Sequence, residues 1–467
     1  KEAAMTNEDL IAAITKGGVA LQEVLSSQIV QQGELVRRQR SSEGLTVNYI
    51  VLDKGQEDEG CPQFNLEEIH RANADAITDI VRDIMDFQQN YVNPEVDKLD
   101  EVMKGELAEV EGRKGAENVG VDNPPVFNGI FNLVSQMLFS IKAEAVAEKA
   151  IIRLKENRKV VIAFANTMES FLDNMTDDEG NLIKTGDTIN TNFTVVLERR
   201  LQSVFKTTTN HPDGNTTYGF IDIKTLNYEA QAAYGAILAK IKKASVGISI
   251  SPIDVIVNKI EAAGYKIGEV TGRKKCIKFN GDNYSSGTVK ARQVKTIDTL
   301  FREFNDNELD VLLINQSGAT GASAHAKPTK KVPAYMVKRR CMIVLQPELD
   351  INKEVQKRGR INRSGQLRWQ VKEDNITELT NKQGEKMSML PEYDYVTSAI
   401  PAEKRLMMML AKKLKSLDAN TTSNQKQSRS ILDFPDFLNK YGDQVVLDYC
   451  KENKEFNKRI GDPLKLN

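Results

Sequence analysis

Short apolar runs alternate with helical patterns in the middle of the chain. Four runs are bounded by turns: KVVIAFA (159–165), KIGEVTG (266–272), DVLLIN (310–315) and CMIVLQP (341–347). Apolar residues recur at helical spacing between them, as in 251–263 and 296–304. Strands that are apolar on both faces and alternate with helices are typical of a parallel sheet covered on both sides. The pattern predicts a doubly wound α/β domain.

Helical patterns flank this domain on both sides. They cover 66–87, 96–110 and 127–157 before it, and 402–417 after it, while LTVNYIVLD (45–53) has the pattern of a strand. We therefore divide the chain into a connector (1–60), an acidic helical region (61–150), the α/β domain (151–375) and a C-terminal helical region (376–467). Residues from about 176 to 245, rich in Thr, Asn and Asp, are expected to form an insertion in the α/β domain.

Charge is divided unevenly along a chain whose formal net charge is -1. Residues 53–111 contain 17 acidic and 5 basic residues, whereas 324–368 contain 12 basic and 3 acidic residues. Attraction to anions must therefore come from a local patch.

The four cysteines and three histidines are scattered, which argues against a disulfide framework and a metal site. No apolar run is long enough for a membrane span, and the chain begins at Lys1, so we expect a soluble protein or a fragment of one.

Two polar segments directly follow predicted strands, where open α/β sheets bind ligands. The first is QSGATGASAHA (316–326), whose small residues let backbone N–H groups approach an anion. The alternative is an ordinary tight turn that needs glycine.

The second segment is EVQKRGRINRSGQ (354–366). If residues 351–363 form a helix capped near Asp350 or Asn352, then Gln356, Arg360 and Arg363 share one face beside Gly359. Two guanidinium groups suit a phosphoryl group, although a solvated basic helix is the simpler reading.

The spacing Q-x-x-G-R-x-x-R over 356–363 resembles the last motif of superfamily 2 helicases. Together with GGVALQEVL (17–25), VVIAFANT (160–167), SPIDVI (251–256), GYKIGEVTGR (264–273) and LLINQSGATGASAHA (312–326), it makes the chain resemble the helicase C-terminal part of Strawberry notch-type proteins. This family lies near the Swi/Snf-type ATPases and also occurs in phages and plasmids. The resemblance implies a second RecA-like helicase lobe, with residues 1–60 as the tail of a first lobe.

The resemblance also implies roles for individual residues. Gln356, Arg360 and Arg363 would act on the nucleotide, the two arginines as arginine fingers, with Gly359 and Gly321 beside it. DNA contacts would come from Gly318, Thr320, Ser323, Thr271, Arg273, Asn166 and Thr167. Gln316 and Ser317 stand where the family usually has an acidic and a small apolar residue, so the coupling of the two sites can differ in detail. For Asn166 and Thr167 an ordinary polar turn is the alternative.

The sequence contains no G-x-x-x-x-G-K-[ST] loop, the element that holds ATP phosphates and Mg²⁺ in such motors. ATP and Mg²⁺ would therefore be bound mainly by a first lobe, and the chain alone is expected not to hydrolyse ATP. One hypothesis is the C-terminal motor lobe of an ATP-dependent DNA helicase or translocase, with DNA and a first RecA-like lobe as partners. The alternative is a non-enzymatic, helicase-derived structural protein of a larger assembly such as a virion. The expected location is the cytoplasm for a bacterial or phage protein and the nucleus for a eukaryotic one.

Overall fold

A computed structural model describes most of the chain. The described residues are 44–52, 67–108, 120–124, 130–165, 182–211, 214–244, 247–281, 283–315, 322–348, 350–398, 400, 403–410, 413 and 441–459, with isolated positions between 12 and 32. Within them, no helix has the length and apolar content needed to cross a bilayer.

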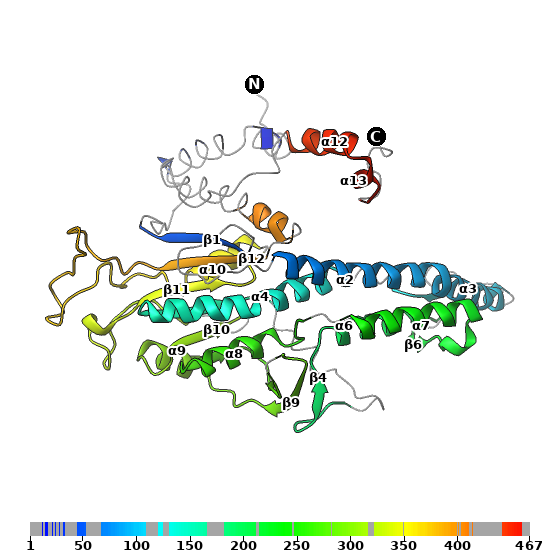
Figure 1. Cartoon of the computed structure of the whole chain (residues 1–467), viewed down its shortest axis with the longest axis horizontal. Helices are drawn as coiled ribbons and strands as arrows, with labels where there is room; N and C mark the ends of the chain where they lie inside the picture. The colour runs from blue at the N-terminus through cyan, green and yellow to red at the C-terminus, as the bar shows by residue number, and fades with distance from the viewer. Residues whose placement is uncertain are drawn as a thin grey trace.

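The centre of the molecule is a six-stranded sheet in which every pair of neighbours is parallel (Figure 1). Its strand order is β1-β12-β11-β3-β10-β7. All four strands predicted from apolar runs are present: β3 (Arg158–Ala163), β7 (Ile267–Val270), β10 (Val311–Ile314) and β11 (Arg339–Val344). The predicted α/β fold of RecA-like type is confirmed.

The other two strands of the sheet correct the predicted organisation. The strand expected at 45–53 is present as β1 (Thr46–Leu52), but it pairs in parallel with β12 and completes this sheet instead of ending a separate lobe. The helical prediction for the region after residue 376 is wrong up to residue 398, because β12 (Glu392–Ser398) lies there between β1 and β11. A helix over 403–410 follows, as predicted.

Helices cover both faces of the sheet because successive strand residues point to opposite sides. Val160 and Ile162 of β3 pack with α4 (Ile130–Lys155) and α8 (Pro252–Ala262) on one face. Val161 and Ala163 face the other side, where α9 (Ile297–Asn305) and the helix over 403–410 complete a second core. Short α10 (Ile351–Arg358) also lies on this second side, through Ile351 in the helix and Ile361 in the turn after it.

A second body extends away from the sheet (Figure 1). The acidic helices α2 (Glu67–Phe87) and α3 (Asn93–Ala108), joined by a π-helical turn at Gln88–Val92, pack there with α6 (Thr194–Ser203) and α7 (Tyr228–Lys243) of the insertion. A small antiparallel sheet of β2 (Gly120–Asp122), β5 (Lys206–Asn210) and β6 (Thr216–Phe220) completes it. The acidic region and the insertion therefore share one hydrophobic core.

A third sheet lies at the free edge of the central one. It contains β4 (Thr188–Asn190) and an antiparallel hairpin, β8 (Lys275–Phe279) and β9 (Ser286–Ala291), in the order β4-β9-β8. This hairpin connects β7 to α9, so it begins directly at the carboxyl end of β7. Helices α12 (Gly442–Glu452) and α13 (Lys454–Arg459) form the last described part of the chain.

Candidate functional site: two arginines at the carboxyl edge of the sheet

Helix α10 begins where the sequence predicted and ends earlier. Asp350 is its N-cap, with the side-chain oxygen Oδ1 accepting a hydrogen bond of 2.9 Å from the backbone N–H of Asn352. The helix ends at Arg358 and Gly359 is its C-cap residue. The prediction of a helix up to residue 363 is therefore wrong, and Arg360 and Arg363 lie in the turn that follows.

The buried face of α10 is fixed by a charged network. Glu354 is fully buried, and its carboxylate accepts a hydrogen bond of 2.7 Å from the Tyr395 hydroxyl and pairs with Lys357 at 2.7 Å. Burial opposes the charge of Glu354, but Lys357 and the backbone N–H of Glu348 outweigh it and lower the pKa of Glu354. The helix is thus tied to β12 by a carboxylate that stays ionised.

Arg358 fixes the end of the helix against the same strand. Its guanidinium lies 5.2 Å from the ring centroids of both Tyr393 and Tyr395. Its Nε donates to the Tyr395 hydroxyl at 2.7 Å, and the Tyr393 hydroxyl donates to the Arg358 carbonyl at 2.9 Å. The turn that carries Arg360 therefore starts from a rigid point.

Arg360 is a nearly buried cation. Its side chain is 7 % exposed, and Nη1 donates to the carbonyl oxygen of Ala322 at 3.1 Å. Arg363 lies beside it, half-buried, with Nε donating to the Gly359 carbonyl at 3.2 Å. Burial, and then the charge of Arg363, lower the pKa of Arg360. Within the described part of the chain neither guanidinium pairs with a carboxylate, and Nε of Arg360 is buried without a hydrogen-bond partner.

Such a pair of guanidinium groups favours an anion. Two adjacent cations without a counter-charge are electrostatically incomplete, and a buried donor without an acceptor is costly. A phosphate group would supply both the negative charge and the acceptor oxygens. Gln356, the third residue predicted to act on the nucleotide, is exposed on the preceding turn of α10.

The segment after β10 meets this pair. The backbone N–H of Ala324 donates to the Arg360 carbonyl at 2.8 Å, and the Ser323 carbonyl accepts a hydrogen bond of 2.9 Å from the Asn305 side chain. Buried Arg340 donates to the Ala324 carbonyl at 2.8 Å. Ser323 thus lies at the edge where it was predicted. The other predicted residues Gly318, Thr320, Gly321, Asn166 and Thr167 lie outside the described residues.

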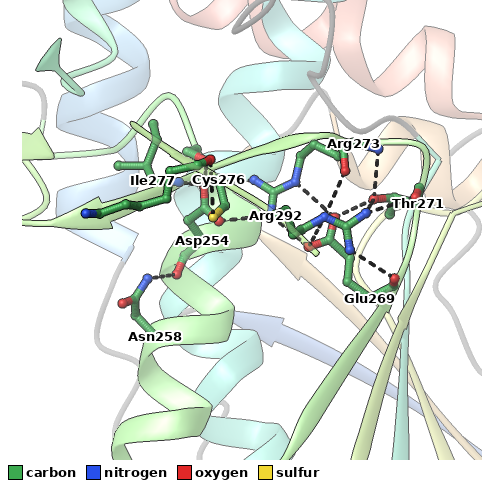
Figure 2. Close-up of polar contacts among 10 residues, drawn as sticks. Asp254, Asn258, Glu269, Thr271, Arg273, Cys276, Ile277 and Arg292 are labelled. Atoms are coloured by element: carbon green, nitrogen blue, oxygen red, sulfur yellow. Dashed lines mark hydrogen bonds and ion pairs between the residues drawn. The ribbon is translucent and has the colours of Figure 1, made fainter. Parts of the chain in front are cut away.

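The prediction that Arg273 contacts DNA is corrected by its burial (Figure 2). The side chain is 2 % exposed, and its guanidinium donates two hydrogen bonds to Asp254, at 2.8 and 2.9 Å, and two to Glu269, at 2.9 and 2.8 Å. Four of the five guanidinium donors are thereby used inside the protein. Thr271, also predicted to bind DNA, is buried and donates its hydroxyl to Glu269.

Arg292 is a residue of this network that sequence reasoning missed. Its guanidinium donates to three backbone carbonyls at the end of β7: Glu269 at 3.2 Å, Thr271 at 3.1 Å and Arg273 at 2.8 Å. The turn that contains exposed Gly272 is therefore held in one shape. Signals existed in the sequence, namely the acids Asp254 and Glu269 within otherwise apolar segments, since buried charges are normally paired.

Comparison with known proteins confirms the predicted resemblance for the C-terminal half of the chain. Residues 251–458 match the model of a helicase C-terminal family described as "C-terminal domain on Strawberry notch homologue". The chain is 24 % identical to Protein strawberry notch of Drosophila melanogaster over 216 residues, which is 45 % of this chain and 11 % of that protein. It is 25 % identical to human Protein strawberry notch homolog 1 over 219 residues, 46 % of this chain and 14 % of the relative. The matched region covers α8 to α13, including the hairpin and both arginines.

Proposed function

We propose that this chain supplies the C-terminal motor lobe of an ATP-dependent DNA translocase or helicase. The observation that carries the proposal is the pair Arg360 and Arg363, which lie at the carboxyl edge of a parallel sheet without a carboxylate partner among the described residues. In such motors the transferred phosphoryl group gains charge during hydrolysis, and arginines from a second lobe stabilise that charge. The family match supports this role.

The two arginines would not act alike. Arg360 is nearly buried and hydrogen-bonded to Ala322, so its position is preset, whereas half-buried Arg363 has more freedom. A preset donor is the better stabiliser of developing charge, because little reorganisation is needed when the charge forms. Arg360 is therefore the principal candidate for contact with the γ-phosphate. Arg363 would attract the nucleotide phosphates from a greater distance.

Coupling to DNA would pass through the segment after β10. The Ala322 carbonyl accepts a hydrogen bond from the Arg360 side chain, and the Ala324 N–H donates one to the Arg360 backbone carbonyl. A shift of this segment on binding a DNA strand would thus move the arginine. ATP and Mg²⁺, held mainly by a first lobe, would supply the leaving group and part of the charge neutralisation.

The test is DNA-stimulated ATP hydrolysis by the complete gene product. Arg360→Lys retains the charge but loses the planar guanidinium, and we expect kcat to fall by about 10³-fold or more. Lys353→Gln, on the exposed side of the same helix, is the matched control and should change kcat less than about twofold. If the wild-type product binds DNA and never hydrolyses ATP, the non-enzymatic structural role replaces this proposal.

A further inference from the structure

A cavity of about 520 Å³ opens at the free edge of the central sheet. Its back wall is apolar, with Val257 of α8, Ile267 of β7, and Leu300 and Leu309 near α9. One side is formed by the β8–β9 hairpin and the segment that follows it. A cavity of this size accommodates a bound ligand segment.

The hairpin presents opposite chemistry on its two faces. Ile277 pairs with Val289, and both are buried against the core of the second body. Because strand side chains alternate, Cys276 and Lys278 of β8 and Lys290 of β9 lie on the other face. Lys278 and Lys290 line the cavity. We call this face the basic wall.

The basic wall carries charge that none of the described carboxylates neutralises. Residues 271–296 contain seven basic residues and one acidic residue. Lys278 and Lys290 are exposed and pair with no carboxylate in the described part of the chain. Lys295, by contrast, is neutralised by Glu303 at 2.8 Å. Glu261 of α8 is the carboxylate on the opposite wall, since Asp254 and Glu269 are both bound to Arg273.

The hairpin is held at a fixed angle to the sheet (Figure 2). The Asp254 carboxylate accepts a hydrogen bond of 2.8 Å from the backbone N–H of Ile277, in addition to its two bonds from Arg273. Arg292, at the end of β9, holds the carbonyls at the end of β7. Burying the three charged side chains Asp254, Glu269 and Arg273 is costly, so such a network is better explained by fixing one geometry than by adding stability.

We propose that the basic wall binds the phosphate backbone of a DNA strand through Lys278 and Lys290. This inference rests on the proposed function and adds a contact surface to it. Lys278 and Lys290 are diagonal neighbours on the two strands, because Lys290 pairs with Cys276 and Lys278 follows two residues later. Such neighbours are about 7–8 Å apart, which is roughly two nucleotide rises along a B-form strand. The basic wall also follows the turn that contains Gly272. A DNA strand that lies along the carboxyl edge of the sheet would therefore continue onto the basic wall.

The test is the affinity of the complete gene product for a fluorescein-labelled 20-nucleotide single-stranded DNA, measured by anisotropy over a range of salt concentrations. For K278Q/K290Q we expect about a tenfold loss of affinity, and the slope of log K against log salt should fall by about 1.4. The matched control is K242Q/K243Q, which removes the same charge from exposed lysines at the end of α7 and should change affinity less than about twofold.

Arg292→Lys tests whether DNA binding depends on the fixed position of the β8–β9 hairpin, and it does so without removing a charge. It should also lower DNA affinity, because the three carbonyl bonds are lost while the net charge is unchanged. Equal losses in K278Q/K290Q and K242Q/K243Q would overturn the basic wall and leave the proposed function standing. No DNA binding by the wild-type product would overturn both. Displacement of the DNA by poly-L-glutamate of equal charge, at equal affinity, would show a general site for acidic chains and overturn the assignment to DNA.

Discussion

Arg360 is joined to Ala322 by a hydrogen bond of 3.1 Å, from guanidinium Nη1 to the backbone carbonyl oxygen. The bond connects the turn after α10 to the segment after β10, which are 38 residues apart in the chain. The arginine expected to contact nucleotide is thus positioned by a segment expected to sense DNA. This bond, together with the one from the Ala324 N–H to the Arg360 carbonyl, connects the two proposed sites.

Loss of the Tyr395 hydroxyl should loosen α10. Tyr395→Phe removes the donor to Oε1 of buried Glu354 and the acceptor of Nε of half-buried Arg358, so we expect a loss of about 1–3 kcal/mol in the free energy of unfolding. Urea denaturation measures it. Tyr218→Phe, whose ring is 83 % exposed on β6, should change stability by less than about 0.5 kcal/mol. Equal effects of the two variants would mean that the network does not stabilise the helix.

Removal of Arg273 should unfold the edge of the sheet, with any loss of DNA affinity secondary to it. Arg273→Met leaves buried Asp254 without its counter-charge and leaves Glu269 with Arg292 alone, 3.8 Å away, and we expect a loss of about 3–5 kcal/mol in the free energy of unfolding. Lys274→Met, at the exposed neighbouring position, is the control. A fully stable Arg273→Met protein with weakened DNA binding would restore the original prediction of a direct contact.

Acid should weaken the same edge. Burial alone would raise the pKa of Glu269, but Arg273 outweighs it, so the pKa lies below its ordinary value of 4.5. The stabilisation from Glu269 is therefore present above pH 4.5 and is lost as the pH falls through the lowered pKa. Hydrogen exchange at the β7 amides should increase in that range in the wild type. If β7 exchanges no faster at pH 3 than at pH 6 after correction for the intrinsic rate, the paired carboxylate has no such role.

Lys159 should make stability rise with pH above neutrality. Its ammonium lies 4.5 Å from the Phe304 ring centroid, and burial, followed by the charge of Arg340, lowers its pKa to about 7. Between pH 7 and 10.5 the unfolded chain holds a proton at this site that the folded chain does not, so the free energy of unfolding increases with pH. Lys159→Met should remove this part of the pH dependence, and Lys266→Met, an exposed control, should keep it. Identical pH profiles for wild type and Lys159→Met would contradict the prediction.

The sequence predicted the sheet where strands are apolar and missed it where they carry charge. β12 contains Glu392 and Asp394, both buried, which is why its pattern does not read as a core strand. Their counter-charges come from distant positions: Arg339 and Arg158 pair with Glu392, and Arg153 of α4 pairs with Asp394. Pairing between residues about 240 positions apart cannot be inferred from local periodicity.

The candidate site was likewise predictable where it depends on local sequence and not where it depends on contacts between distant residues. Local chemistry narrowed the cap to Asp350 or Asn352, of which the structure has Asp350, and spacing sufficed to single out Arg360 and Arg363. The role of Arg273 depends on Asp254 of helix α8, which is 19 residues away in the chain, so an arginine that looks available in the sequence proves to be internal. The predicted length of α10 was wrong because the helix ends before Gly359, and glycine ends a helix more readily than it continues one.

Residues 1–467 alone should not turn over ATP, because their sequence has no loop to hold the phosphates. A coupled assay with the purified chain at saturating ATP and DNA measures this. Sustained hydrolysis that Arg360→Ala abolishes would show that the phosphate-binding group lies within this chain.

The most direct test of the central claim is the affinity of the complete gene product for ADP with aluminium fluoride, a mimic of the transferring phosphoryl group, compared with ADP. If Arg360 stabilises developing charge, Arg360→Ala should weaken the fluoride complex by about 100-fold or more and leave ADP affinity within about threefold. Equal weakening of both ligands, or of neither, would contradict a role for Arg360 in phosphoryl transfer.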